Sequence, residues 1–454
     1  MLMYILWIKR MSYFTLVFIG FLFIFFDVID TSPYYTLPYY KEARERLDQI
    51  TLYPDNGQVF SGFSKVNITP DVKKQSVPLA GYTARNGNFA KGVHDSLFIK
   101  AVSIHVGQTT ITMVSMDLLI TPPEVYHSVM EWLKTLPNPP YLYFSATHTH
   151  AGLGGWDPSW IGEEFAGTYQ KSLVDLFIRS TKQAITESLN QRNRSSIGST
   201  TLSAPKFTRN RLNKVYGTIN PDLHCTYIIP ENEKPIILTA YQSHATVLSP
   251  KNFLLSGGYP GLLQLTLEQS LNVNALFFAG AVGSHSPAYI EGTHYPQAQE
   301  LADSLSNKII RALPQIKLKS TIKINALTFP LTLPDLQFRV HKYVKLTPFL
   351  GRKIISPEHS FFNMMMIDST LWIGTPCDFS GELANEIKYF SSHRGYSSVV
   401  TSFNGNYIGY ITPTRYYYDY QYESFVMGWY GPQMTDYLMD ILRHSILKIT
   451  QHPY

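Results

Sequence analysis

Apolar runs separated by polar, glycine-containing turns predict alternating strands and helices from about residue 57 onward. Strands are expected at residues 97–105, 109–119, 236–240, 275–280, 322–329, 364–372 and 397–403. Helices are expected at residues 122–136, 163–189, 262–271, 297–313 and 434–449. The first two strands would form a hairpin across Gly107-Gln108. This alternation is typical of an α/β protein, here a single large domain with a mixed β-sheet and flanking helices.

The N-terminus carries an almost wholly apolar run at residues 11–26, after Lys9 and Arg10. The run predicts a hydrophobic helix, which Val28 and Ile29 could extend toward the roughly 20 residues of a membrane span. It lacks a small-residue cleavage site, which favours an uncleaved anchor over a cleaved signal peptide, and its place at the extreme terminus disfavours a buried core helix. The expected organisation is an anchor or signal segment at 1–30, a connecting segment at 31–56 and a globular domain at 57–454.

Charge and cysteine content exclude several classes of protein. The formal net charge of +5 is small for 454 residues, and no basic run is interleaved with aromatic residues, so no nucleic-acid partner is expected. The two cysteines, Cys225 and Cys377, exclude a disulfide framework and a multi-cysteine zinc site.

The most informative segment is Thr147-His148-Thr149-His150-Ala151-Gly152, which follows a short apolar strand. Side chains at i and i+2 of an extended chain point to the same side, so His148 and His150 can enter one pocket. Histidine is a common metal ligand and the usual acid or base at neutral pH. The alternative is a pair of buried histidines that are satisfied by hydrogen bonds.

Four later segments place further polar side chains at strand ends. They carry His244 in 240–246, Ser286 in 280–287, Asp378 and Glu382 in 374–382, and Tyr410 with Tyr422 in 407–423. Taken singly, each has a structural alternative, such as a turn serine, a capping aspartate or a core tyrosine.

Together and in this order, these segments resemble the neutral/alkaline non-lysosomal ceramidase family. The similarity begins near Lys65-Val66-Asn67-Ile68-Thr69-Pro70 and reaches about Pro432. The resemblance implies a zinc ion held by His148, His244, Asp378 and Tyr410. Asp378, in Pro376-Cys377-Asp378-Phe379, stands where the family has glutamate. Glu382 is expected at a helix start instead, where the helix dipole favours an acidic side chain.

The resemblance also implies roles around the reacting carbonyl. His150 would lie beside the metal, Arg211 would be an active-site arginine, and Tyr422 would help to bind the carbonyl. Ser286, which precedes Pro287, matches the residue assigned as nucleophile, although Ser284 replaces an acidic residue of the family pattern. Whether Ser286 or zinc-activated water attacks stays open, with water favoured because no histidine base for Ser286 is identifiable.

These features predict a zinc-dependent amidase that hydrolyses the N-acyl bond of ceramide or a related lipid amide. Zinc activates water near neutral pH and polarises a carbonyl. The expected partners are the lipid substrate and a membrane, with the domain anchored on the periplasmic or extracellular face, or alternatively secreted. The other functions are a zinc hydrolase of another amide or ester, such as an N-acyl amino acid, and an inactive lipid-binding protein of the same fold.

Overall fold

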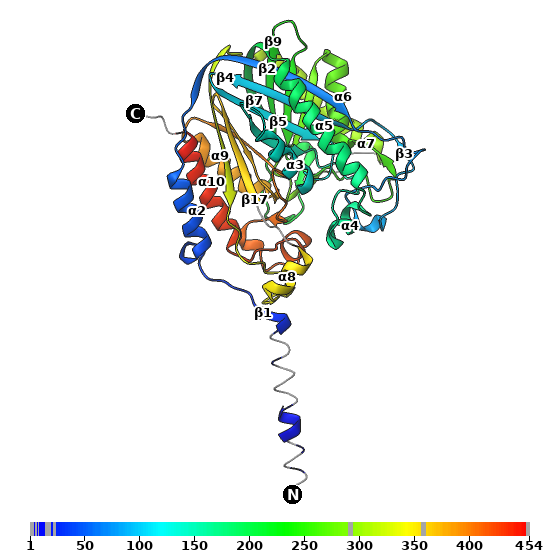
Figure 1. Ribbon diagram of the computed structural model, residues 1–454, viewed down its shortest axis with the longest axis vertical. Helices are drawn as coiled ribbons and strands as arrows, with labels where there is room; N and C mark the ends of the chain where they lie inside the picture. The colour runs from blue at the N-terminus through cyan, green and yellow to red at the C-terminus, as the bar shows by residue number, and fades with distance from the viewer. Residues whose placement is uncertain are drawn as a thin grey trace.

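A twelve-stranded mixed β-sheet forms the centre of the protein, as the computed structural model in Figure 1 shows. The structure describes residues 24–288, 294–355 and 360–450 and, nearer the N-terminus, residues 4, 7, 9–13 and 20. The sheet runs β12-β10-β9-β7-β2-β14-β17-β18-β20, and β4, β5 and β6 continue from β2. The strands are β2 (Asp55–Asn67), β4 (Phe98–Val106), β5 (Thr109–Met116), β6 (Tyr141–Ala146), β7 (Asn193–Ser203), β9 (Asp222–Pro230), β10 (Ile236–Tyr241), β12 (Asn274–Ala279), β14 (Thr321–Leu331), β17 (Ser360–Ile367), β18 (Thr370–Gly374) and β20 (Ser397–Thr401).

The sheet is mixed, as the sequence predicted. The pairs β5–β6, β10–β12 and β18–β20 are parallel, whereas pairs such as β4–β5 and β17–β18 are antiparallel hairpins. The sheet curls so that its two halves share a layer of buried side chains, which includes Tyr143 of β6, Phe278 of β12 and Trp372 of β18. Tyr143 also bonds to Thr401 of β20 at 2.6 Å, and Gly280 after β12 forms a bridge with the same residue. The carboxyl ends of distant strands therefore meet, and the loops that follow them begin in one place.

Helices cover the outer faces of the curled sheet. Helices α3 (Pro123–Leu133) and α5 (Lys171–Asn190) pack on the half that contains β4 and β5. Helices α6 (Gly258–Leu271) and α7 (Tyr295–Ala312) cover β10 and β12. Helices α9 (Gly381–Ser392), α10 (Met434–Thr450) and α2 (Pro38–Gln49) cover β14, β17 and β18, and Figure 1 shows α2 alongside α10. One sheet with helices on its outer faces agrees with the predicted α/β domain.

The N-terminal prediction is only partly covered by the described residues. Most of the predicted hydrophobic helix at 11–26 lies outside them, and its proposed extension through Val28 is wrong. Residues Phe26–Val28 form strand β1 instead, which pairs with β16 (Val344–Leu346) and through it with β15 (Arg339–His341). None of the helices in the described part of the chain has the length and apolar character needed to cross a bilayer.

Two predicted elements proved to be divided. The helix expected at 163–189 is two helices, α4 (Trp160–Ala166) and α5, which break at Gly167. The φ of Gly167 is +68°, and a Cβ there would lie 2.6 Å from Pro78 Cβ, so a helical residue with a side chain cannot continue at this point. The strand expected at 364–372 is the hairpin β17–β18, which turns at Asp368 with φ of +54°.

Candidate active site

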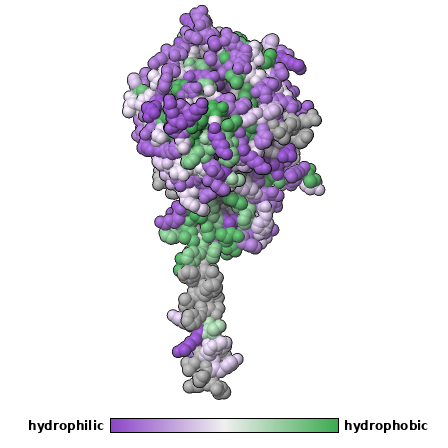
Figure 2. All heavy atoms as spheres, turned by 90° about the vertical axis from the view of Figure 1, so that its right-hand side faces the viewer, coloured by the Kyte–Doolittle hydropathy of each residue, from purple (hydrophilic) through white to green (hydrophobic). Residues whose placement is uncertain are grey.

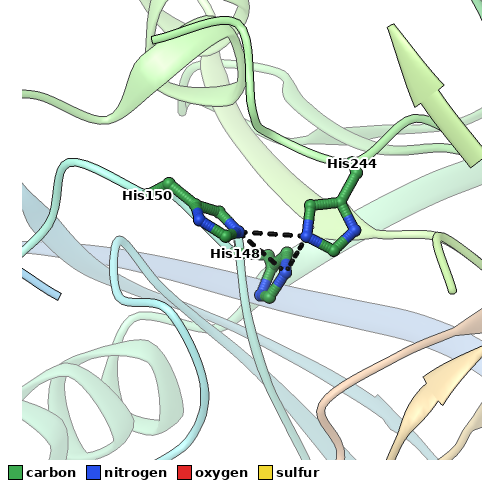
Figure 3. Close-up of side chains that lie close together, drawn as sticks. All are labelled: His148, His150 and His244. Atoms are coloured by element: carbon green, nitrogen blue, oxygen red, sulfur yellow. Dashed lines mark hydrogen bonds between the residues drawn. The ribbon is translucent and has the colours of Figure 1, made fainter. Parts of the chain in front are cut away.

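Three histidine side chains converge at the carboxyl ends of β6 and β10 (Figure 3). His148 and His150 follow β6, and His244 follows β10. The Nε2 atoms of His148 and His244 are 2.8 Å apart, and that of His150 lies 3.2 Å from His148 and 3.0 Å from His244. The structure thus brings together the histidine pair and the later histidine that the sequence singled out.

The other ring nitrogens determine where the protons lie. Nδ1 of His148 lies 2.6 Å from the Leu119 carbonyl, and Nδ1 of His150 lies 2.9 Å from the Gly81 carbonyl. A carbonyl only accepts, so each Nδ1 carries hydrogen and each Nε2 carries a lone pair. Nδ1 of His244 lies 3.4 Å from the Val282 carbonyl oxygen, which accepts, and also 3.4 Å from Nη2 of Arg211, which donates. Burial lowers the pKa of His148 to about 3 and holds the pKa values of the other two rings well below their usual range. Three neutral rings bring their Nε2 atoms together, and those of His148 and His150 present lone pairs there, an arrangement suited to a cation.

The backbone around the histidines adopts sparsely populated conformations. His148 has φ of +61° and stacks on Phe403, which has φ of +66°, with ring centroids 3.9 Å apart. Gly81 has φ of +116°, and a Cβ there would lie 2.7 Å from His150 Cα. Left-handed backbone at residues other than glycine costs free energy and is concentrated at functional sites. The packing here therefore holds the imidazoles in one orientation.

Asp378 and Tyr410 reach the histidines from a small separate ladder. Strands β19 (Asp378–Phe379) and β21 (Tyr410–Ile411) are parallel, with Asp378 directly opposite Tyr410. Oδ2 of Asp378 accepts a 2.6 Å bond from Tyr407, whereas Oδ1 has no hydrogen-bond partner among the described residues. Oδ1 lies 3.6 Å from Nδ1 of His244, and burial raises the pKa of Asp378 to about 7. This unpaired buried oxygen faces the imidazoles and is the kind of group that a cation would satisfy.

Arg211 and Tyr422 lie at the edge of the same cluster. Arg211 Nη2 donates to the Tyr410 hydroxyl at 3.1 Å, and its Nε lies 2.9 Å from the carboxylate of Glu423. The ring of Tyr422 makes an edge contact with Tyr410 at 5.9 Å between centroids. Tyr422 is half-exposed and begins the π-helix Tyr422–Val426, so it stands between the buried site and solvent.

Ser286 and Glu382 bond to groups other than the three histidines. The Ser286 hydroxyl accepts a 3.2 Å bond from Nε of Arg209, its partner across the short β13–β8 ladder of His285–Pro287 and Thr208–Asn210. Glu382 accepts from Asn210 at 2.7 Å and forms an ion pair with Arg415. Glu382 is thus satisfied by a separate network in the first turn of α9.

A cavity of about 880 Å³ opens onto the site. The cavity wall includes His148, His150, His244, Arg211, Asp378, Tyr410 and Tyr422. Ser286 is absent from the described residues that form this wall. Much of the remaining wall is apolar or aromatic, including Leu119, Ile120, Trp156, Phe165, Met427 and Trp429. A polar cluster that opens into an apolar chamber is the usual form of a small-molecule site.

The donor set fits zinc. Imidazole nitrogens with a carboxylate oxygen are typical catalytic zinc ligands, and the three histidines form a group able to hold a metal ion. The three Nε2 separations are similar, so the prediction that His150 lies beside the metal, not on it, stays a prediction. Sequence reasoning missed Tyr407, Phe403 and Glu423 as supports of the site. The only available signal was their position within or beside the segments that carry Tyr410 and Tyr422.

Comparison with known proteins agrees with this geometry at the level of the fold. Neither family models nor curated proteins match the sequence. Among solved structures, neutral ceramidase from Pseudomonas aeruginosa matches with a TM-score of 0.72 and 15% identity, over 87% of this chain and 74% of that chain. A ceramidase complexed with C2 matches with a TM-score of 0.71 and 15% identity, over 87% and 75% of the two chains. The chain therefore has the neutral ceramidase fold, and the resemblance in the sequence is confirmed at that level.

Proposed function

We propose that this protein is a zinc-dependent amidase that hydrolyses the N-acyl bond of ceramide or a related lipid amide at a membrane surface. The observation that carries the proposal is the triangle of Nε2 atoms, 2.8–3.2 Å apart, in the wall of a large apolar cavity. The solved ceramidases of the same fold support the choice of reaction.

The cavity supports a lipid as the substrate. Its volume of about 880 Å³ lies toward the upper end of the roughly 300–1,000 Å³ found for ligand sites. Each methylene buried against walls such as Phe165 and Trp429 contributes about 0.8 kcal/mol, so an acyl chain gains affinity with length. Apolar and aromatic side chains form much of the wall, as a molecule with long apolar chains requires.

Zinc would be held by His148, His244, Asp378 and Tyr410, with His150 beside the metal and free to act in proton transfer. When bound, zinc supplies a Lewis acid that polarises the amide carbonyl and lowers the pKa of water. The carboxylate of Asp378 would balance the metal charge, because its Oδ1 has no other partner among the described residues.

The remaining side chains would bind and orient the amide. The Arg211 guanidinium and the Tyr422 hydroxyl would donate to the oxygen that becomes negative as the carbonyl is attacked, and one such donor is worth roughly 10²–10³ in rate. Glu423 holds the guanidinium from its far side. In the arrangement predicted from the sequence, Nε2 of His150 takes up a proton and delivers it to the leaving amine.

Among the described residues, the Ser286 hydroxyl bonds to Arg209 and to no histidine, which favours attack by water. Membrane anchoring through residues 11–26, with the domain on the periplasmic or extracellular face, completes the proposal.

The test is turnover of a fluorescent N-acyl-sphingosine by the purified protein, beside a fluorescent N-acyl amino acid. Turnover of the sphingosine derivative should be lost with a chelator, return on addition of zinc, and be absent in His148→Ala. The matched control is His105→Ala, because His105 is a half-buried histidine of β4 that bonds to Thr110 outside the cavity. If only the amino acid derivative is turned over, the substrate is another amide and not a lipid. If the lipid binds but neither compound is turned over, the protein is a lipid-binding protein.

A further inference from the structure

A second apolar surface lies at the foot of the protein, where the N-terminal segment joins the body. It is formed by β1, β15, β16 and α8 (Pro348–Ile354), and we call these four elements the collar. Figure 2 shows hydrophobic residues gathered at this point. Side chains of the collar and its immediate neighbours are unusually exposed for their size, including Ile24, Val28, Tyr343 and Phe349, which is 68% exposed. Clustered exposed apolar side chains mark an interaction surface.

The collar is basic as well as apolar. Residues 336–355 contain five lysines and arginines, and the one acidic residue of the collar, Asp27 of β1, lies 3.8 Å from Lys345. Nζ of Lys353 lies 5.7 Å from the ring centroid of Phe349, and Nζ of Lys342 lies 5.4 Å from that of Tyr343. Each pair presents an aromatic ring beside an ammonium group, the combination that favours the interface of a bilayer containing anionic lipids.

The collar is joined to the wall of the substrate cavity. Arg339 of β15 donates to the carbonyl oxygens of Tyr417 and Ser424, and its guanidinium stacks on the Tyr417 ring at 3.9 Å. The segment that it holds contains the π-helix that begins with Tyr422, which lines the cavity. Ile355, directly after α8, lines the cavity too. The collar and one side of the cavity wall therefore form one packed unit.

We propose that the collar docks on a lipid bilayer containing anionic headgroups, so that a lipid amide reaches the cavity from the membrane. The occupant is a membrane because the chain enters the collar directly from the apolar run at residues 11–26, and because the collar carries basic and aromatic groups together. The proposal deepens the function proposed above and rests on its lipid substrate.

The experiment uses the full chain, reconstituted in vesicles of phosphatidylcholine with or without phosphatidylserine. Both native cysteines are buried, so an environment-sensitive fluorophore on one introduced cysteine reports a single position. The test position is Phe349→Cys, and the matched control is Tyr389→Cys on α9, where the tyrosine is 69% exposed. Figure 1 labels α9 and α8 in different parts of the molecule. Nitroxide-labelled lipids should quench the first label, more strongly with phosphatidylserine present, and leave the second unchanged.

A charge variant tests the basic contribution separately. The double variant Lys342→Gln/Lys353→Gln should lower the ratio of bilayer-docked to undocked collars by about fivefold per lysine. This is the effect expected for basic residues near an anionic surface. The labelled and charge variants should keep the thermal unfolding midpoint of the parent protein, because the replaced side chains are exposed or half-exposed.

Equal quenching at both positions, or none at either, would overturn the docking proposal. Self-quenching of the Phe349→Cys label that is independent of lipid would overturn it too, by showing that a second copy covers the collar. Turnover of an N-acyl-sphingosine in detergent micelles, measured in parallel, separates the two proposals. Turnover without selective quenching contradicts only the proposal that the collar docks on the bilayer. Selective quenching without turnover contradicts only the proposal that the protein is an amidase.

Discussion

Replacing Gly81 by alanine tests whether close packing sets the geometry of the histidine cluster. The added Cβ would lie 2.7 Å from Cα and 2.9 Å from Nδ1 of His150, whereas ordinary contact begins at 3.4 Å. The backbone of His150 must therefore move by about 0.7 Å, or Gly81 must leave its present conformation. Either change disturbs the bond between the Gly81 carbonyl and Nδ1 that fixes the His150 ring.

Two separate terms determine how far Gly81→Ala lowers the free energy of unfolding. Alanine at φ of +116° is strained by about 1–3 kcal/mol, and overpacking a rigid backbone adds about 1–3 kcal/mol. The free energy of unfolding should thus fall by about 2–6 kcal/mol. A displacement approaching 1 Å at a reacting group lowers turnover by roughly 10²-fold, and His150 would be displaced directly.

Gly395→Ala provides the matched control. Gly395 has φ of +80°, but no heavy atom lies within 4 Å of the position that an alanine methyl would take, so only the conformational cost of about 1–2 kcal/mol applies. Urea unfolding of both variants, with zinc content and turnover, separates strain from steric contact. The reasoning is refuted if Gly81→Ala costs no more than Gly395→Ala and keeps its zinc and its turnover.

Three further predictions concern metal, pH and the nucleophile. His148→Ala and His244→Ala should each lose bound zinc by elemental analysis while remaining folded, and full zinc content in both would contradict the proposed centre. Burial raises the pKa of Asp117 from 3.8 to about 6, so the folded state binds more protons than the unfolded chain between these values. The free energy of unfolding should accordingly fall by about 3 kcal/mol as pH rises through this window, and urea unfolding of Asp117→Asn should show that part of the slope removed. Ser286→Ala should retain substantial turnover because its hydroxyl bonds to Arg209 and does not line the cavity; complete loss with zinc retained would favour a serine nucleophile.

The spacing of apolar residues predicted the strands and helices in which buried positions recur at regular intervals. The hairpin β4–β5 and helix α10 agree with prediction to within about three residues, because their apolar positions repeat without interruption. The β17–β18 hairpin was missed because its turn uses Asp368 and Ser369 instead of glycine or proline. Asp and Ser are common turn residues, but two of them between long apolar stretches are a weak signal, so the two strands were predicted as one apolar run.

The meeting of His148, His150 and His244 was predictable from the sequence, but the side chains that support them were not. His148 and His150 are close in sequence and follow an apolar strand, so a local pattern is sufficient to find them. Tyr407, in contrast, contributes through one hydrogen bond to Asp378 that exists only once β19 and β21 pair. Gly81 matters because it packs against His150, which is 69 residues later in the chain. A local sequence pattern cannot show such a contact.

The packing of α2 against α10 has a consequence for synthesis on the ribosome. The Tyr40 hydroxyl donates to Asp440 at 2.8 Å, between residues 400 positions apart. At translation rates of roughly 5–20 residues per second, Asp440 of α10 is synthesised on the order of 20–80 s after Tyr40 of α2. During that time the apolar side of α2, which includes Ala43 and Leu47, has no covering helix. A nascent chain stalled before Met434 should therefore remain protease-sensitive in α2 until the final helix emerges.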